Sequence, residues 1–510
     1  MTPISVAELC ARFDGSDEFA LIDPREEGIF TRAHLLGASN LPLSRLELLI
    51  GKTVPRLDTE IVLTDDGDNV AVRTASVLSG LGYTNIRQLA GGLAAWSVAG
   101  FHLFSGVNII GKAFGEYLEH TAGTPSIRPE DLKDRLERGE NVFLLDSRTP
   151  AEHANFCIPG ALSCPNGEMV YRALPAIPEG AAVVVHCAGR TRSILGAQTL
   201  IEAGAAGEVV ALENGTIDWE FAGLDLEHGA SRPLDKPEAA PLPTARALAD
   251  AQGVEEITAD RLLSWRTESD RTLCLLDVRG KEEFAAGHLA GARHAPGGQL
   301  VQNVDRYLVV RNALTVLVDD DGVRARASAY WLSRMGYRNV FTLTASGTNK
   351  PPRAAAGLPQ SVSVDDVVGN PEWVVADVRT SVSYRRGHVP GAWFLTRAYL
   401  ARDEGNLPAG SIVLVGADAG YVALIAADLQ ALGREVFCLE GGMNAWCAAE
   451  KPVETGLTAL ASAPDDMHVN GGDLDDPAQA AREYRRYLDW EIGLIDMMPG
   501  DPAATWYSAA

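Results

Sequence analysis

The sequence predicts an α/β protein built from four tandem small domains, each a parallel sheet flanked by helices. A fourfold internal repeat is the first observation behind this prediction, and repeats of this kind are sought before anything else. The second is the alternation of short, continuous Val/Ile/Leu runs with stretches of helical spacing. Continuous apolar runs are typical of strands buried on both faces, as in parallel sheets. A chain of 510 residues has room for several such domains.

Each repeat begins with an apolar strand followed by Asp, one residue and Arg. This pattern reads LIDPR at Leu21–Arg25, LLDSR at Leu144–Arg148, LLDVR at Leu275–Arg279 and VADVR at Val375–Arg379. A turn containing His follows in repeats one, three and four. Repeat two has FCIPGALS instead, with Phe156 and Cys157 where the others place a small residue and His.

A second apolar run follows 40 to 42 residues after each Asp and ends at Asp65, Cys187, Asp319 and Ala417. Helical spacing then predicts helices over Ala71–Leu81, Ser193–Ala203, Ala325–Met335 and Val422–Leu432. Repeats one, two and four end in a similar segment whose last residue is Trp96, Trp219 and Trp446 respectively. Repeat three has LTASGTNK at this place and lacks the Trp.

These landmarks divide the chain. We expect domains at 1–105, 120–230, 253–350 and 358–455, with a bridge between the first two. The Pro/Ala-rich stretch at 231–252 is expected to be an extended linker between the halves. The tail, 456–510, contains a predicted helix at Pro477–Leu494 whose Tyr484, Tyr487 and Trp490 have the spacing of a helix that docks on a domain.

The candidate site lies in repeat two, where the strand VVVHC leads into Cys187-Ala-Gly-Arg-Thr-Arg192 and then a helix. Sites in open α/β sheets lie at the carboxyl ends of strands. A loop of this kind points main-chain N–H groups inward above a helix start, which binds anions and stabilises a thiolate. Cys187 is therefore the candidate nucleophile, and Arg190 and Arg192 add positive charge beside it.

These motifs together resemble the rhodanese family of sulfurtransferases. The resemblance covers all four repeats, roughly 400 residues. The six-residue loop from Cys187 to Arg192 is similar to the thiosulfate-type active loop, whereas related phosphatases carry one more residue between Cys and Arg. The resemblance implies four rhodanese-like domains, of which the second is catalytically competent.

By that resemblance, Cys187 attacks the sulfane sulfur of thiosulfate or a related persulfide donor. The sulfur then passes from the Cys187 persulfide to a thiol, to cyanide, or to a protein acceptor. Ala188, Gly189, Arg190, Thr191 and Arg192 would bind the anionic substrate, and Asp146 and Arg148 would support the loop structurally. No metal or organic cofactor is expected.

Two alternatives stay open. The first is a persulfide sensor or scaffold whose thiol takes up sulfur without turnover. The second is phosphatase-like or arsenate-reducing activity, which the loop length opposes. Repeats one, three and four are expected to be inactive, because Asp65, Asp319 and Ala417 cannot carry a sulfane sulfur.

Composition narrows the partners. The net charge of −24 disfavours nucleic acid as a partner. The sequence shows neither a secretory signal nor a spanning segment, which predicts a cytoplasmic protein with no membrane partner.

The seven cysteines are too sparse for a disulfide framework. Cys157 and Cys164 could supply a resolving thiol, although small apolar fillers are the simpler reading, and Cys10, Cys274, Cys438 and Cys447 are expected in the core. The triplet Asp319–Asp321 is read as a solvated turn rather than a metal site.

Overall fold

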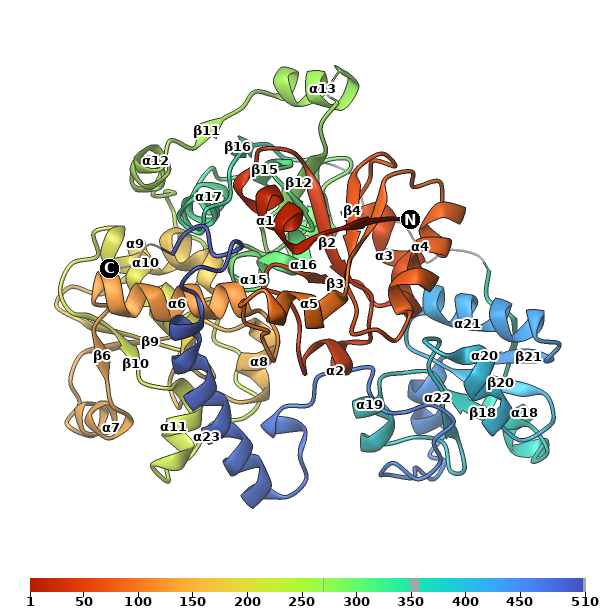
Figure 1. Cartoon of the computed structure of the whole chain (residues 1–510). Helices are drawn as coiled ribbons and strands as arrows, with labels where there is room; N and C mark the ends of the chain where they lie inside the picture. The colour runs from red at the N-terminus through yellow and green to blue at the C-terminus, as the bar shows by residue number, and fades with distance from the viewer. Residues whose placement is uncertain (269, 348, 350–356, 508–510) are drawn as a thin grey trace.

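Four sheets with helices on their faces make up the molecule, which confirms the predicted fold class (Figure 1). The computed structural model describes residues 1–268, 270–347, 349 and 357–507. Within each repeat the strands pair in parallel and in the same order, so that the first strand of the repeat lies at one edge and the third at the other.

The strands occupy corresponding positions in the four repeats. Repeat one contains β1 (Thr2–Ile4), β2 (Phe19–Asp23), β3 (Ser39–Asn40), β4 (Glu60–Leu63) and β5 (Ile86–Leu89). Repeat two contains β6 (Ser126–Ile127), β7 (Val142–Asp146), β8 (Leu162–Ser163), β9 (Ala182–His186) and β10 (Val209–Leu212). Repeat three contains β11 (Glu255–Glu256), β12 (Leu273–Asp277), β13 (Arg293–His294), β14 (Val310–Arg311), β15 (Leu314–Asp319) and β16 (Val340–Thr344). Repeat four contains β17 (Gln360–Val362), β18 (Val374–Asp377), β19 (Trp393–Phe394), β20 (Ile412–Val415) and β21 (Val436–Leu439).

The helix after β4, β9, β15 and β20 lies close to its expected place in each repeat. These helices are α4 (Val70–Gly80), α10 (Thr191–Glu202), α17 (Arg324–Arg334) and α21 (Ala419–Ala431). The other α-helices are α1 (Val6–Asp14), α2 (Glu27–Phe30), α3 (Leu46–Thr53), α5 (Gly92–Val98), α6 (Ile109–Ala122), α7 (Pro129–Glu137), α8 (Pro150–Asn155), α9 (Leu174–Ala176), α11 (Gly215–Phe221), α12 (Leu242–Ala251), α13 (Ala259–Glu268), α14 (Lys281–Ala286), α15 (Gly297–Gln302), α16 (Val304–Tyr307), α18 (Val364–Gly369), α19 (Ser381–Arg386), α20 (Leu400–Asp403), α22 (Gly442–Ala448) and α23 (Pro477–Gly493).

The expected extended linker is partly helical. Its second half forms α12, which begins with a proline in its first turn and buries Ala245, Leu248 and Ala249. These three residues lie on one face at helical spacing, so burial of that face outweighs the turn-forming prolines before it.

At the ends of repeat three and of the tail, residues 348, 350 and 508–510 lie outside the described residues.

Repeats one to three and the tail share one hydrophobic core. The ring of Phe114 on α6 lies 6.0 Å from that of Trp331 in repeat three and 5.4 Å from that of Trp506 in the tail. Strand β14 joins repeat three to the sheet of repeat one through antiparallel pairing of Val310 with Ala20. Repeat four packs around separate clusters and lies to one side of the other three repeats (Figure 1).

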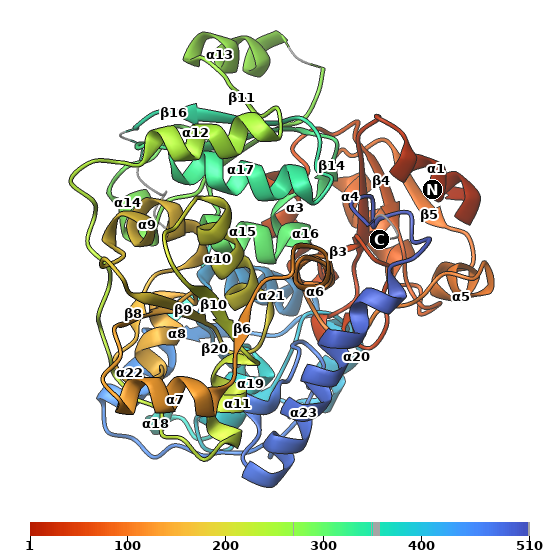
Figure 2. The same cartoon turned by 90° about the vertical axis from the view of Figure 1, so that its left-hand side faces the viewer.

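Two helices from outside the repeats lie against each other. Helix α6 joins repeats one and two, and α23 from the tail contacts it and runs toward the lower edge of the molecule (Figures 1 and 2). Within the described residues, no helix combines the length and the apolar character that a membrane crossing requires.

Candidate active site

Cys187 lies at the carboxyl end of β9, a central strand of its sheet between β10 and β7. The loop after it runs directly into α10, whose first residue is Thr191. The Cys187 Sγ lies 3.6 Å from the Ser193 hydroxyl, and the Cys187 side chain is 2% exposed. The thiol therefore lies beneath the loop and close to the N-terminus of α10.

The main chain of this loop is arranged to receive an anion. The carbonyls of Cys187 and Ala188 accept hydrogen bonds of 2.9 and 3.1 Å from the amides of Thr216 and Ile217, which open α11. Among the hydrogen bonds of the described residues, none is donated by the main-chain N–H groups of residues 188–192. A run of unpaired amides beside a helix N-terminus binds negative charge.

The conformation of Gly215 shows why a glycine stands in LENGTIDW, the run that closes repeat two. Gly215 has a φ of +56°, and a Cβ there would collide with the carbonyl oxygen of Cys187. Gly92 meets the carbonyl oxygen of Asp65 in the same way in repeat one. The glycine thus lets the following helix approach the loop.

Arg190, predicted to bind an anionic substrate, has carboxylate partners inside the protein. Its guanidinium pairs with the Glu116 carboxylate at 2.8 Å and also with Glu119, both on α6. Its remaining nitrogen donates to Asn214 at 3.0 Å. With each terminal nitrogen paired inside the protein, Arg190 anchors the loop to α6. Burial outweighs this pairing for Glu116 and raises its pKa to about 7.

Arg192 also has a carboxylate partner. Both of its terminal nitrogens bind Glu152, at 2.8 and 2.9 Å, and Glu152 in turn forms the capping box of α8 with Thr149. The Arg192 charge remains close enough to the Cys187 sulfur to interact with it electrostatically. Its pairing with Glu152 fixes its orientation.

Asp146 and Arg148 form a buried pair with Nη2–Oδ2 at 2.8 Å, and Arg148 also donates to the carbonyl of Phe156. Equivalent pairs occur in the other three repeats at 2.6, 2.7 and 2.6 Å. His153 lies 3.0 Å from Asp146. Beneath the loop, burial lowers the pKa of His186 to about 4, so this imidazole is neutral at pH 7.

The tail contributes residues that the sequence did not place here. A Cβ at Gly189 would lie 3.2 Å from the Tyr487 ring, and Thr191 donates a hydrogen bond to Glu491. Burial first, and then the Glu491 carboxylate, raise the pKa of Tyr487. Lys112 of α6 lies against the Tyr487 and Trp490 rings, 4.8 and 4.6 Å from their centroids. Lys112 ends the longest charge-free stretch of the sequence, and this was a signal that could have singled it out.

The model of the rhodanese-like domain matches this chain at residues 5–99, 128–222, 258–348 and 363–449. The chain belongs to the rhodanese-like family. A crystal structure of thiosulfate sulfurtransferase from Pseudomonas aeruginosa is 40% identical, covers 100% of both chains and superposes with a TM-score of 0.90. A sulfurtransferase from Allochromatium vinosum is 38% identical over 100 residues, which are 20% of this chain and 92% of that protein. A putative sulfur carrier protein, YrkF of Bacillus subtilis, is 27% identical over 25% of this chain and 72% of its own length.

In rhodanese repeats one and three, a carboxylate fills the place of the cysteine. Asp65 accepts from the amides of Gly67 and Ala71 at 3.2 and 3.0 Å. Asp319 accepts from those of Gly322 and Ala325 at 3.0 and 2.9 Å. These loops therefore direct their amides at a carboxyl group of their own, where the loop of the second rhodanese repeat leaves its amides unpaired.

The remaining cysteines of this rhodanese-like chain differ in exposure. Cys157 and Cys164 are buried, and among the described residues neither has a hydrogen bond or disulfide to Cys187. Burial raises the pKa of Cys164. Of the four expected in the core, Cys438 is buried, but Cys447 is exposed and Cys10 and Cys274 are partly exposed, which corrects that expectation.

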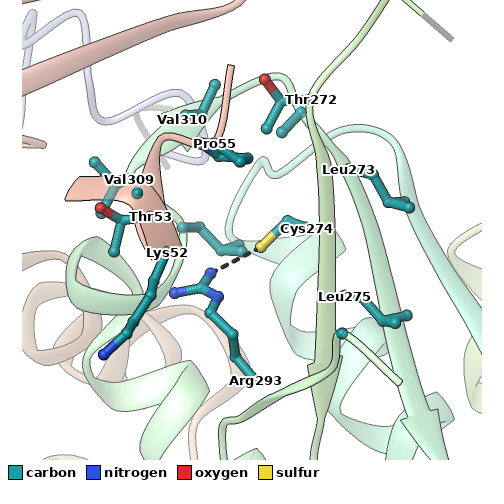
Figure 3. A pocket seen from close by; sticks show the side chains of 14 residues that line it. Lys52, Thr53, Pro55, Thr272, Leu273, Cys274, Leu275, Arg293, Val309 and Val310 are labelled. Carbon is teal, nitrogen blue, oxygen red and sulfur yellow. Dashed lines mark hydrogen bonds between the residues drawn. The ribbon is translucent and has the colours of Figure 1, made fainter. Parts of the chain in front are cut away.

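Cys274 lines a cavity of about 240 Å³ between rhodanese repeats one and three (Figure 3). Its sulfur accepts a hydrogen bond of 3.1 Å from Arg293, which also donates to the carbonyl of Tyr307 at 2.8 Å. None of the residues that line this cavity belongs to repeat two, so it is separate from the loop of Cys187.

Proposed function

We propose that this chain is a sulfurtransferase that carries a sulfane sulfur on Cys187. The donor is thiosulfate or a related persulfide, and the acceptor is a thiol or cyanide. The unpaired amides of residues 188–192 are the observation that carries this proposal, because a persulfide is an anion that needs such donors. The likeness over the full chain to the thiosulfate sulfurtransferase supports the choice of donor.

The reaction divides into two displacements. The Cys187 thiolate attacks the outer sulfur of thiosulfate, the S–S bond of the donor breaks, and sulfite leaves with the bonding electron pair. An acceptor thiolate then attacks the outer sulfur of the Cys187 persulfide, so that the acceptor leaves as a persulfide and the Cys187 thiolate is restored. Cyanide in place of the thiol gives thiocyanate. A covalent intermediate of this kind predicts ping-pong kinetics.

The sites in this proposal have distinct roles. The amides of Ala188 to Arg192 hold the negative charge of the persulfide, and the Ser193 hydroxyl lies next to the reacting sulfur. Arg192 supplies positive potential from its fixed position on Glu152. Asp146 and Arg148 brace the strand end, as their counterparts do in repeats that lack the cysteine.

A second function is favoured by one observation. Cys187 is 2% exposed, and a thiol so well covered fits a protein that takes up sulfur once, as a persulfide sensor or scaffold. The two functions differ in turnover: a transferase makes many equivalents of thiocyanate from thiosulfate and cyanide, whereas a sensor makes at most one.

The test is intact-protein mass spectrometry after incubation with thiosulfate. We expect one added sulfur, about 32 mass units, on the Cys187 peptide, its release by cyanide, and repeated turnover. Cys187→Ser should abolish loading, and Cys447→Ser, which removes an exposed thiol in repeat four, should leave it unchanged. Absence of the added mass from the unaltered protein would refute sulfur transfer through Cys187.

A further inference from the structure

Lys112 is a buried cation that, among the described residues, forms no ion pair. Lys112 is 6% exposed, yet among the described residues no carboxylate oxygen lies within 4 Å of its ammonium group and no acceptor forms a hydrogen bond with it. Its contacts are the faces of Tyr487 and Trp490. The acidic side chains that act on Lys112, Glu491 and Asp305, lie beyond ion-pair distance. Burying an ammonium group without an ion pair is costly, so a bound anion would stabilise Lys112.

This cation lies beside the loop of Cys187. Tyr487 contacts both Lys112 and the position of Gly189, two residues after Cys187. The charges of Glu491, Arg192 and Asp305 all act on Lys112, and Glu491 and Arg192 also act on Tyr487. Helix α23 therefore places Lys112 and the thiol around the same side chain.

The arginines of the loop leave this role open. Arg190 is neutralised by Glu116 and Glu119, and Arg192 by Glu152. A donor such as thiosulfate carries two negative charges, and in an acidic protein these need a cation that is not already paired. Lys112 meets that requirement.

We propose that Lys112 binds the oxyanion end of the sulfur donor and of the sulfite that leaves, which makes it a substrate-binding residue. This inference rests on the proposed function and sharpens it, because it selects donors with a sulfonate-type head over hydropersulfides, which lack one. The Tyr487 and Trp490 rings hold the ammonium group in place by cation–π contact.

The test uses sulfite as the probe in the full-length Cys187→Ser protein, so that no covalent step intervenes. Calorimetry should show sulfite binding, and Lys112→Met should weaken it roughly tenfold or more, the loss expected for a buried charge-assisted contact. Lys112→Arg should bind sulfite more tightly than Lys112→Met does. Lys133→Met, which removes an exposed lysine of α7, is the matched control and should leave sulfite affinity unchanged.

A second readout separates ligand binding from a structural role. Removing a buried charge that has no ion pair should leave Lys112→Met folded and at least as heat-stable as the Cys187→Ser protein that retains Lys112. Sulfite should raise the Tm of the protein that retains Lys112 and leave that of Lys112→Met unchanged. In proteins that retain Cys187, Lys112→Met should raise the KM for thiosulfate and leave loading from a hydropersulfide unchanged.

Sulfite affinity that is undetectable in the parent, or equal in Lys112→Met, would overturn the inference, as would an equal loss with both donors. Failure of the proposed function looks different: the unaltered protein would gain no sulfur, whatever its affinity for sulfite.

Discussion

At the scale of the residue, the energetic cost of Lys112 can be measured through pH. Burial lowers its pKa from the ordinary value of 10.5 to about 8. The native state therefore loses this proton near pH 8, whereas the unfolded chain keeps it until about pH 10.5. Between these values the unfolded state binds more protons, so native stability rises with pH. At pH 7 the penalty is fully present, and it amounts to about 3 kcal/mol.

Lys112→Met should consequently be more stable than the parent at pH 7, and this advantage should shrink between pH 8 and pH 10. Thermal denaturation of both proteins across this range measures the difference. The groups that face Lys112 are Tyr487 and Glu491 on α23, Arg192 on α10, Asp305 on α16 and His468 in the tail. These groups are present in both proteins, so a gap in Tm that is independent of pH would contradict the assignment.

At the scale of the element, α23 covers the loop of Cys187. Tyr487 lies over Gly189, and Glu491 accepts from Thr191, so two successive turns of the helix contact the loop. Trp490 packs against Gly106, where a Cβ would lie 2.8 Å from its ring. We expect that a small molecule reaches the thiol of Cys187 only when this contact opens, because Cys187 is buried.

We therefore expect Tyr487→Ala combined with Trp490→Ala to speed alkylation of Cys187 by iodoacetamide, by roughly the tenfold that a loss of about 1.4 kcal/mol in closure gives. Peptide mass spectrometry follows the modified cysteine directly. Tyr484→Ala is the matched control, because Tyr484 packs on Gly471 and Gly472 in the tail rather than on the loop. Equal rates in the double variant and the unaltered protein would show that α23 does not limit access.

The same helix shows how far sequence reasoning reaches. Cys187, its loop and the Asp146–Arg148 pair follow from local motifs, and the fourfold register predicts the order of strands and helices around them. The partners of the loop come from distant segments: Glu116 lies 74 residues before Arg190, and Glu491 lies 300 residues after Thr191. Neither contact leaves a periodic signal, so the sequence could not show that Arg190 pairs with carboxylates of α6. Docking of α23 was predictable from its aromatic spacing, but the surface that it covers was not.

At the scale of the whole molecule, the distribution of cores predicts two unfolding units. Repeats one to three and the tail share one core that includes Phe114, whereas Leu414 belongs to a cluster within repeat four to which Leu48 of repeat one adds a partly buried contact. The junction of repeat four with repeat one combines the partly buried apolar contacts of Leu48 and Tyr399 with polar ones, such as the 2.7 Å ion pair of Arg397 with Glu47. Polar contacts of this kind couple domains weakly.

Calorimetry should accordingly resolve two transitions. Leu414→Ala, which removes about 2–5 kcal/mol from a buried strand, should lower the transition of repeat four and leave sulfur loading of Cys187 intact. Phe114→Ala should lower the other transition and reduce loading, because α6 carries both Phe114 and the Glu116 that anchors Arg190. A single transition that both substitutions shift equally would mean that the four repeats unfold as one unit, and the junction would then have to be far stronger than its ion pairs suggest.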